Sequence, residues 1–273
     1  AIISNVFTTR LFRNPMQTDY MDLFVDSDIN LAYMPTVHVK TGIDSTDVPL
    51  STVDVNFFNA SYLLSRTASL GEPGTAEIIV TGTSLDSKAV QDTTYFSYGY
   101  IGGSGGKIAL FDCTIAIGDG SLDTAELITV TREEECSDCR AKTAVSEISI
   151  VSAVYRVEPA SARFPGTLSI GSSEALPGTA AVYRRMNGRW MFAGNGAGAE
   201  ELSADIEGGG EYAVGVDNSP PRITITADGQ PVMTISDNGS GIDSRSITVT
   251  AVSGDVTYDY DAHTGRVRLS PDL

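Results

Sequence analysis

The sequence predicts an all-β protein made of three consecutive β-sandwich domains, the last of them incomplete. Short runs of alternating apolar and polar residues recur along the chain, turn residues separate these runs, and few stretches have helical periodicity. The chain has 273 residues. This length exceeds the usual size of one domain, so we expect more than one.

The first predicted domain covers residues 1–102. Its candidate strands lie close together along the chain, which favours a sandwich over a parallel α/β sheet. These strands are Met21–Val25, Thr36–Lys40, Val53–Phe58, Ser61–Thr67 and Ala76–Thr81, with a turn signal at Gly71–Gly74. The glycine-rich run Gly102–Gly106 follows and predicts a flexible linker or a tight turn. No Lys-Ser or Lys-Thr pair follows it, so we do not expect a phosphate-binding loop.

The second predicted domain covers residues 103–218 and carries a family resemblance. Its motifs are, in order, Gly105-Gly-Lys-Ile-Ala-Leu110, Glu126–Thr131, Ala153–Pro159 with Phe164–Ile170, Gly188-Arg-Trp190 and Tyr212-Ala-Val214. This order resembles the β-sandwich domain first named from ankyrins and netrin receptors, and its bacterial relatives. Some members of that family cleave themselves at a His-Phe-Ser before the closing strand. The matching place here reads Gly208-Gly-Gly-Glu211, so we expect no self-cleavage.

The third predicted domain covers residues 219–273, after a stiff Pro220-Pro221 joint. Five strands can be counted: Arg222–Ala227, Pro231–Ser236, Ser246–Val252, Val256–Tyr260 and Arg266–Leu269. Ser236-Asp-Asn-Gly-Ser-Gly-Ile242 resembles the turn of bacterial immunoglobulin-like repeats. In such repeats two more strands commonly follow the equivalent of Arg266–Leu269, and a sandwich of this kind has about seven.

This count predicts an incomplete immunoglobulin-like domain with an open edge beside Arg266–Leu269. An open edge can pair with a strand of another chain, so self-association by β-strand addition is one hypothesis. A boundary within a longer protein is the alternative explanation.

The net charge of −17 argues against binding to nucleic acid or to an anionic membrane surface, because phosphate recognition uses clustered Lys and Arg, which this chain lacks. An acidic surface is typical of a protein that stays soluble at a crowded or salty cell exterior. No run of about 18 apolar residues exists, so we expect no membrane span in this segment.

The three cysteines are Cys113, Cys136 and Cys139. Cys136-Ser-Asp-Cys139 is a CxxC motif in an acidic context, with no second CxxC to complete a zinc site. We therefore predict a small loop disulfide between Cys136 and Cys139 in an oxidising compartment, with Cys113 buried or free.

Catalysis is not expected from the sequence. The two histidines, His38 and His263, are far apart in the chain, and neither lies near a G-x-S-x-G nucleophile motif. Paired carboxylates such as Asp119 and Asp123 lie in turn-like segments, where Asp forms hydrogen bonds with the backbone.

Two binding functions remain as alternatives. Asp237, Asn238 and Asp243 offer oxygen ligands for calcium on one turn, with Asp26, Asp28 and Asp217 near the joints, although ordinary Asx turns explain them as well. No other cofactor is expected. Trp190, Phe192 and Tyr183 could form a carbohydrate platform, but strand alternation favours packing in a sandwich core.

The sequence therefore predicts a non-catalytic structural, spacer or adhesive module of a secreted or cell-surface microbial protein. Its expected partners are other domains of the parent protein and further copies of itself. The alternatives are an accessory C-terminal region of a secreted hydrolase, such as a protease, and a carbohydrate- or calcium-binding module.

Overall fold

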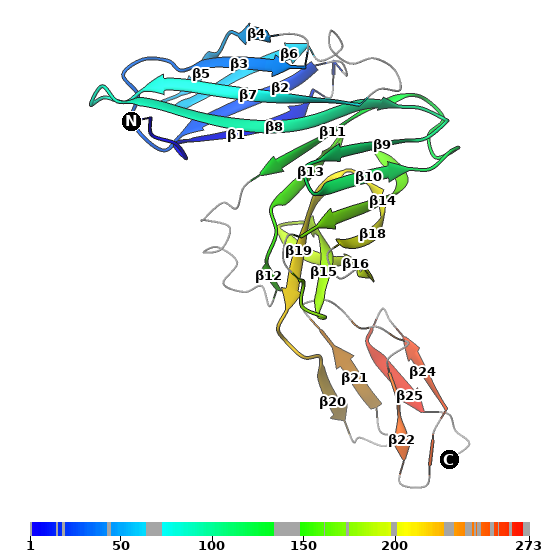
Figure 1. The fold of residues 1–273 in the computed structure, drawn as a ribbon. Coiled ribbons are helices and arrows are strands. Elements are labelled where there is room, and N and C mark those ends of the chain that lie inside the picture. Colours follow the sequence, from blue (N-terminus) through cyan, green and yellow to red (C-terminus); the bar gives the residue numbers. More distant parts are fainter. Residues whose placement is uncertain are drawn as a thin grey trace.

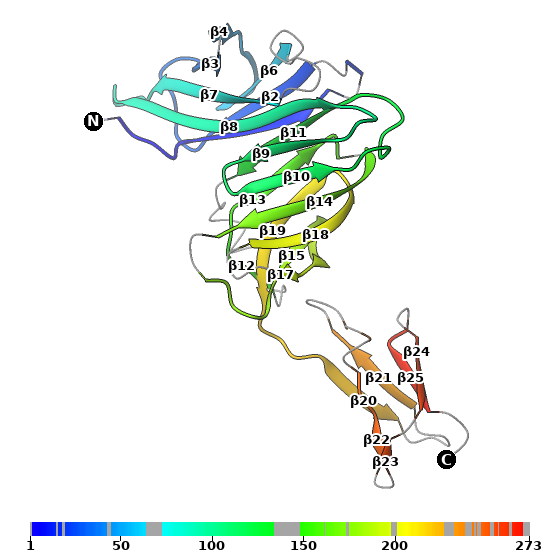
Figure 2. The same cartoon turned by 45° about the vertical axis from the view of Figure 1, so that its right-hand side comes forward.

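The chain folds entirely as β-structure in the part that the computed structural model describes (Figure 1, Figure 2). The described residues are 2–14, 16–17, 20–42, 45–63, 73–133, 148–160, 162–172, 175–197, 201–226, 232–237, 242, 244, 247–251, 254–255, 257–261 and 264–269. No α-helix occurs among them, so none is long and apolar enough to cross a membrane. The predicted all-β class is confirmed.

One long antiparallel sheet, here called the shared sheet, runs through most of the structure. Its strand order is β16-β15-β19-β13-β11-β8-β7-β3-β4, and β12 pairs with β19 beside this path. In chain order its strands are β3 (Thr36–Thr41), β4 (Ser45–Val48), β7 (Gly74–Thr83), β8 (Ala89–Ile101), β11 (Glu126–Glu133), β12 (Ile148–Ile150), β13 (Val154–Glu158), β15 (Ala180–Met186), β16 (Arg189–Gly194) and β19 (Gly210–Asp217).

A smaller sheet, the N-terminal layer, packs on one part of the shared sheet. It has the order β1-β2-β6-β5 and consists of β1 (Phe7–Arg13), β2 (Tyr20–Ser27), β5 (Ser51–Asp54) and β6 (Phe57–Leu63). Alternate residues of β2 are buried, as period-2 alternation predicts. They meet the buried side chains of β3, β7 and β8 in one apolar cluster that includes Met21, Leu23, Ile78, Val80 and Phe96.

A second smaller sheet, the central layer, packs on another part of the shared sheet. It has the order β17-β18-β14-β10-β9 and consists of β9 (Gly106–Leu110), β10 (Cys113–Ile117), β14 (Arg163–Gly171), β17 (Gly196–Ala197) and β18 (Glu201–Gly208). Its apolar cluster contains Ile115, Phe164 and Leu168 of the layer, together with Tyr155 and Tyr212 of the shared sheet.

Strand β8 joins the two parts of the shared sheet. It pairs with β7 from Ala89 to Tyr98 and with β11 from Phe96 to Ile101. The predicted boundary between residues 102 and 103 falls in the turn after β8, and strands from both sides of it, β8 and β11, pair in one continuous sheet. The glycine run that follows is a tight turn and not a flexible linker, because the Gly105 N–H donates to the Gly102 carbonyl at 2.9 Å.

The C-terminal residues form a four-stranded sheet and a two-stranded hairpin. The sheet order is β20-β21-β25-β24, and the strands are β20 (Arg222–Thr226), β21 (Val232–Ser236), β22 (Thr250–Ala251), β23 (Gly254–Asp255), β24 (Tyr258–Asp261) and β25 (Arg266–Leu269). The expected open edge beside Arg266–Leu269 is wrong, because β25 pairs with both β21 and β24. Strand β20 is an outer strand of this sheet, with all five residues exposed.

The predicted strand Val53–Phe58 is also wrong. The structure divides this segment between β5 and β6, with a turn at Val55 and Asn56. Asn56 has a φ of 62°, a conformation that Asn tolerates better than most residues, and the Asp54 carboxylate accepts a hydrogen bond from the Val55 N–H at 2.7 Å.

The turn after β8 gives a stability test. Gly105 has a φ of +69°, and a Cβ there would lie 2.4 Å from the Ile117 carbonyl oxygen. Gly120 has a φ of +73° but open space around its missing Cβ. We expect Gly120→Ala to lower the free energy of unfolding by about 1 kcal/mol through backbone conformation alone, and Gly105→Ala to lower it by at least about twice that. Urea denaturation of both variants measures the difference, and equal losses would contradict this packing.

Candidate functional site

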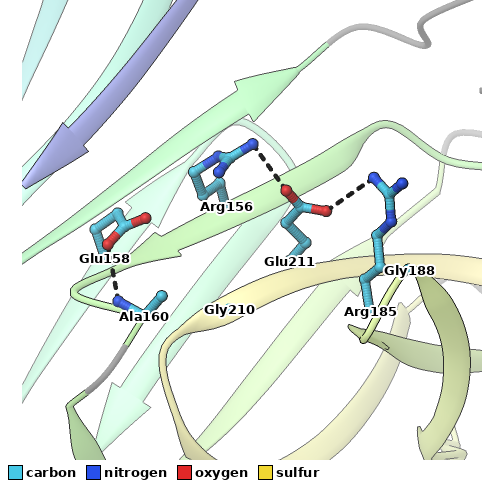
Figure 3. A pocket seen from close by; sticks show the side chains of 7 residues that line it. All are labelled: Arg156, Glu158, Ala160, Arg185, Gly188, Gly210 and Glu211. Atoms are coloured by element: carbon cyan, nitrogen blue, oxygen red, sulfur yellow. Dashed lines mark hydrogen bonds and ion pairs between the residues drawn. The ribbon is translucent and has the colours of Figure 1, made fainter. Parts of the chain in front are cut away.

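A row of charged side chains crosses four neighbouring strands of the shared sheet. Cross-strand pairing aligns Arg156 of β13 with Glu211 of β19, and Glu211 with Arg185 of β15. The Glu211 carboxylate accepts from Arg156 at 2.8 Å and from Arg185 at 3.2 Å, so one glutamate holds two guanidinium groups (Figure 3). Because directly paired residues share a face, the sheet register itself builds this row.

The same row reaches the N-terminal layer. The Arg156 guanidinium also donates to Glu133 Oε1, through Nε at 3.0 Å and Nη2 at 2.8 Å. It lies 4.7 Å from the centroid of the Phe12 ring, which belongs to β1. Next to Phe12, Arg13 forms an ion pair with Glu126. Charged groups therefore connect β1 with β11 and β13, where the N-terminal layer ends.

A cavity of about 360 Å³ lies over this row. Four charged side chains supply its polar wall, and glycine and alanine leave room between them. Its lining residues are Arg156, Glu158, Ala160, Arg185, Gly188, Gly210 and Glu211 (Figure 3). Arg185 and Gly188 are exposed at its rim, whereas Glu158 is buried. The cavity offers both signs of charge to a small polar group.

Glu158 is the unusual member of the cavity, since a buried carboxyl group is costly to ionise. Its residue is only 7% exposed, and its Oε2 accepts a hydrogen bond from the Ala160 N–H at 2.8 Å. Burial raises the pKa of Glu158, and the nearby Glu211 carboxylate adds to this effect. The Ala160 hydrogen bond and the charges of Arg156 and Arg13 oppose it. Glu158 can therefore keep its proton at a pH above the range in which a glutamate ordinarily loses it.

The predicted calcium ligands are only partly described. Asp237 follows β21, while Asn238 and Asp243 lie outside the described residues. The Asp217 carboxylate accepts from the Ser219 N–H at 2.9 Å, as in an ordinary Asx turn. In the described part of the chain, no three His, Cys, Asp or Glu side chains are grouped so as to hold a metal. A calcium site at Asp237, Asn238 and Asp243 stays a prediction.

Of the three cysteines, Cys113 lies within the described residues. Cys113 on β10 is a free thiol and is buried, as expected. Burial, with a smaller contribution from Asp112, raises the pKa of its thiol strongly, so thiolate chemistry at Cys113 is suppressed. Cys136 and Cys139 lie outside the described residues, and their disulfide stays a prediction.

The three aromatic residues split into two environments. Trp190 and Tyr183 are buried, which confirms packing for these two, but Phe192 is 44% exposed and contacts Tyr183 edge-on at 6.3 Å. Their cluster also contains Ile148, Ala181 and Ala213, and it is separate from both main clusters. The expectation that all three fill the interior of a sandwich is therefore wrong for Phe192, because β16 lies at the end of the shared sheet.

His38 has polar partners that the sequence analysis did not anticipate. It lies on β3, and its ring nitrogens contact Ser45 and Asp47 of the neighbouring strand β4. A search for local motifs misses this cluster, because its members come from two strands. The sequence does contain His38-x-Lys40 on one strand and Ser45-x-Asp47 on the next. These residues predict a cluster only once the pairing of the two strands is known. His263 lies outside the described residues.

Comparison with protein-family models and with curated proteins finds no match for this chain. The resemblance of residues 103–218 to the ankyrin and netrin-receptor type of β-sandwich therefore stays a prediction.

The buried carboxyl group gives a pH test. A glutamate whose pKa is raised in the folded state favours folding when protonated, so its destabilising effect appears as pH rises through that pKa. We expect Glu158→Gln to leave the free energy of unfolding nearly unchanged at about pH 4 and to increase it at pH 8. Urea denaturation across this range is the measurement.

Glu201→Gln is the matched control, because Glu201 is exposed and its replacement removes one charge without a change in burial. Lower stability of Glu158→Gln than of the parent at pH 8 would show that Arg156 and Arg13 outweigh burial.

Proposed function

We propose that this chain is a structural spacer or adhesive module of a secreted or cell-surface microbial protein. One observation carries the proposal: the two predicted domains 1–102 and 103–218 share a single hydrogen-bonded sheet instead of a linker. A spacer must hold its ends at a fixed separation, and a continuous sheet resists bending between its parts better than a flexible joint does.

Packing supports the same proposal. On β11, Leu127 belongs to the cluster under the N-terminal layer and its neighbour Ile128 to the cluster under the central layer. Successive residues of a strand point to opposite faces, so the two layers cover opposite faces of the shared sheet. Relative movement of the layers would disturb one strand that is anchored on both sides.

The charged row adds directional contacts to this junction. Arg156 forms ion pairs with two glutamates of the shared sheet and contacts the Phe12 ring of the N-terminal layer. Because Arg156 is partly buried, these contacts are less screened than surface ion pairs. They favour one orientation of β1 relative to β13.

Assembly through strand addition is the adhesive version of the proposal, and it uses β20. Ile223 and Ile225 are each 63% exposed, and among the described strands β20 pairs only with β21. An exposed edge with alternating apolar residues can accept a strand from another chain. The acidic net charge supports a place outside the cell, where solubility under varied conditions matters.

Spin labels test the rigid connection. Val53 lies on β5 of the N-terminal layer, and Met191 lies on β16 at one end of the shared sheet. Both side chains are exposed. In a background with Cys136→Ser and Cys139→Ser, we expect labels at Val53→Cys and Met191→Cys to give one narrow distance distribution by pulsed electron paramagnetic resonance. The Cys113 thiol is buried and should not react.

Labels at Val53→Cys and Leu85→Cys form the matched control, because both sites are exposed, Val53 in the N-terminal layer and Leu85 in the turn between β7 and β8, the strands on which that layer packs. A distribution for the first pair that is several times broader than for this control would reject the rigid spacer.

A further inference from the structure

We propose that Ser45 is a nucleophile activated by His38 and that it accepts acyl groups from activated esters. In the structure, Ser45 Oγ lies within hydrogen-bonding distance of His38 Nε2, and His38 Nδ1 lies 2.9 Å from Asp47 Oδ1. The histidine is thus held between a hydroxyl group and a carboxylate, which is the order of groups that activates a serine.

The strand register produces this order. His38 of β3 is paired directly with Asp47 of β4, and Lys40 is paired with Ser45. Ser45 and Asp47 are two residues apart on one strand, so both side chains project from the same face toward His38. The imidazole ring can then contact one partner directly across the ladder and the other diagonally.

Hydrogen-bond chemistry selects the reactive tautomer. An ionised Asp47 carboxylate can only accept a hydrogen bond, so a neutral His38 ring facing it carries its proton on Nδ1. His38 Nε2 is then the basic nitrogen, and it accepts from the Ser45 hydroxyl. This is the arrangement that a general base requires before proton transfer.

Access and charge also suit a reaction at this place. Strand β4 lies at the end of the shared sheet (Figure 1), and Ser45 is exposed. Lys40, directly across from Ser45, brings an ammonium group to the same face, where it also lies 3.6 Å from Glu77. A positive charge on the face of the hydroxyl favours the negative oxygen that develops in acyl transfer, and the Glu77 carboxylate offsets part of that charge here.

Solvent exposure decides the substrate class. The Asp47 side chain is 92% exposed and that of His38 is 40% exposed, so water screens the field of the carboxylate. The cluster therefore lacks the dry environment that amide hydrolysis demands, and esters with a good leaving group are the substrates that its chemistry fits.

The proposed reaction is balanced. Ser45 Oγ forms a bond to the acyl carbon while its proton passes to His38 Nε2. The bond to the leaving oxygen breaks with the electron pair on that oxygen, and His38 gives its proton to the departing alcohol. Water then attacks the acyl carbon while His38 Nε2 takes a proton from it, the bond from the acyl carbon to Ser45 Oγ breaks, and His38 returns the proton to Ser45 Oγ as the carboxylic acid leaves. The sum is ester plus water giving acid plus alcohol.

The experiment uses the whole chain with p-nitrophenyl acetate and with a fluorophosphonate. The fluorophosphonate forms a bond from phosphorus to Ser45 Oγ and releases fluoride, so its adduct persists and can be located by mass spectrometry. We expect both reagents to modify Ser45. The rate constant should fall about a hundredfold in His38→Gln, the lower end of what a positioned general base contributes.

Variants at the two strands separate activation from simple exposure. Asp47→Asn should slow labelling of Ser45, and Asp47→Glu should restore part of the rate, because it keeps a carboxylate near His38. Ser51→Ala is the matched control. Ser51 is exposed on β5, so this change removes an exposed serine that is not on β4 with Ser45. These side chains are exposed or half-buried, and circular dichroism verifies that each variant is folded.

Two results would overturn the proposal. One is labelling of Ser45 at the same rate in His38→Gln as in the parent chain. The other is p-nitrophenolate release that persists in Ser45→Ala, which would assign the reaction to His38 or Lys40 directly. Neither result bears on the rigid connection between the layers, so this proposal and the spacer function fail separately.

Discussion

The structure depends on strand β8 serving two apolar cores at once. Phe96 and Tyr98 point into the cluster under the N-terminal layer, while Ile101 belongs to the cluster under the central layer. Because alternate residues of a strand face opposite sides, one strand can contribute to both clusters without a bend. The strands between residues 7 and 217 therefore form three stacked sheets, in which the N-terminal layer and the central layer cover opposite faces of the shared sheet at different places along its length.

This arrangement explains where charge can be buried. At the end of the N-terminal layer, the outer face of β11, β13 and β19 is neither fully covered nor fully open. Polar side chains occupy that margin, where the charges of Arg156 and Glu211 compensate each other. Paired charges cost less to bury when the partners are held in place, and the sheet register holds Arg156 and Glu211 in place, whereas burial raises the pKa of Glu158.

Several strands followed directly from sequence pattern, and β8 did not. Strands β2 and β3 alternate cleanly because only one of their faces is buried. In β8, the run from Phe96 to Tyr98 is buried on both faces, so its apolar pattern has no simple period. The prediction of one strand over Val53–Phe58 was wrong for another reason: a turn at Asn56 interrupts residues of high strand propensity.

The sequence by itself determined the all-β class, the acidic character and the positions of strands such as β2, β3 and β7, because alternation, composition and turn residues are local properties. Only the tertiary structure decided which strands pair. It placed β25 inside its sheet, joined two predicted domains through β8, and brought Ser45 and Asp47 to His38. Hydrogen bonds between strands link residues distant in the chain, and a register shift of one residue would reverse every face, so no local pattern could specify these contacts.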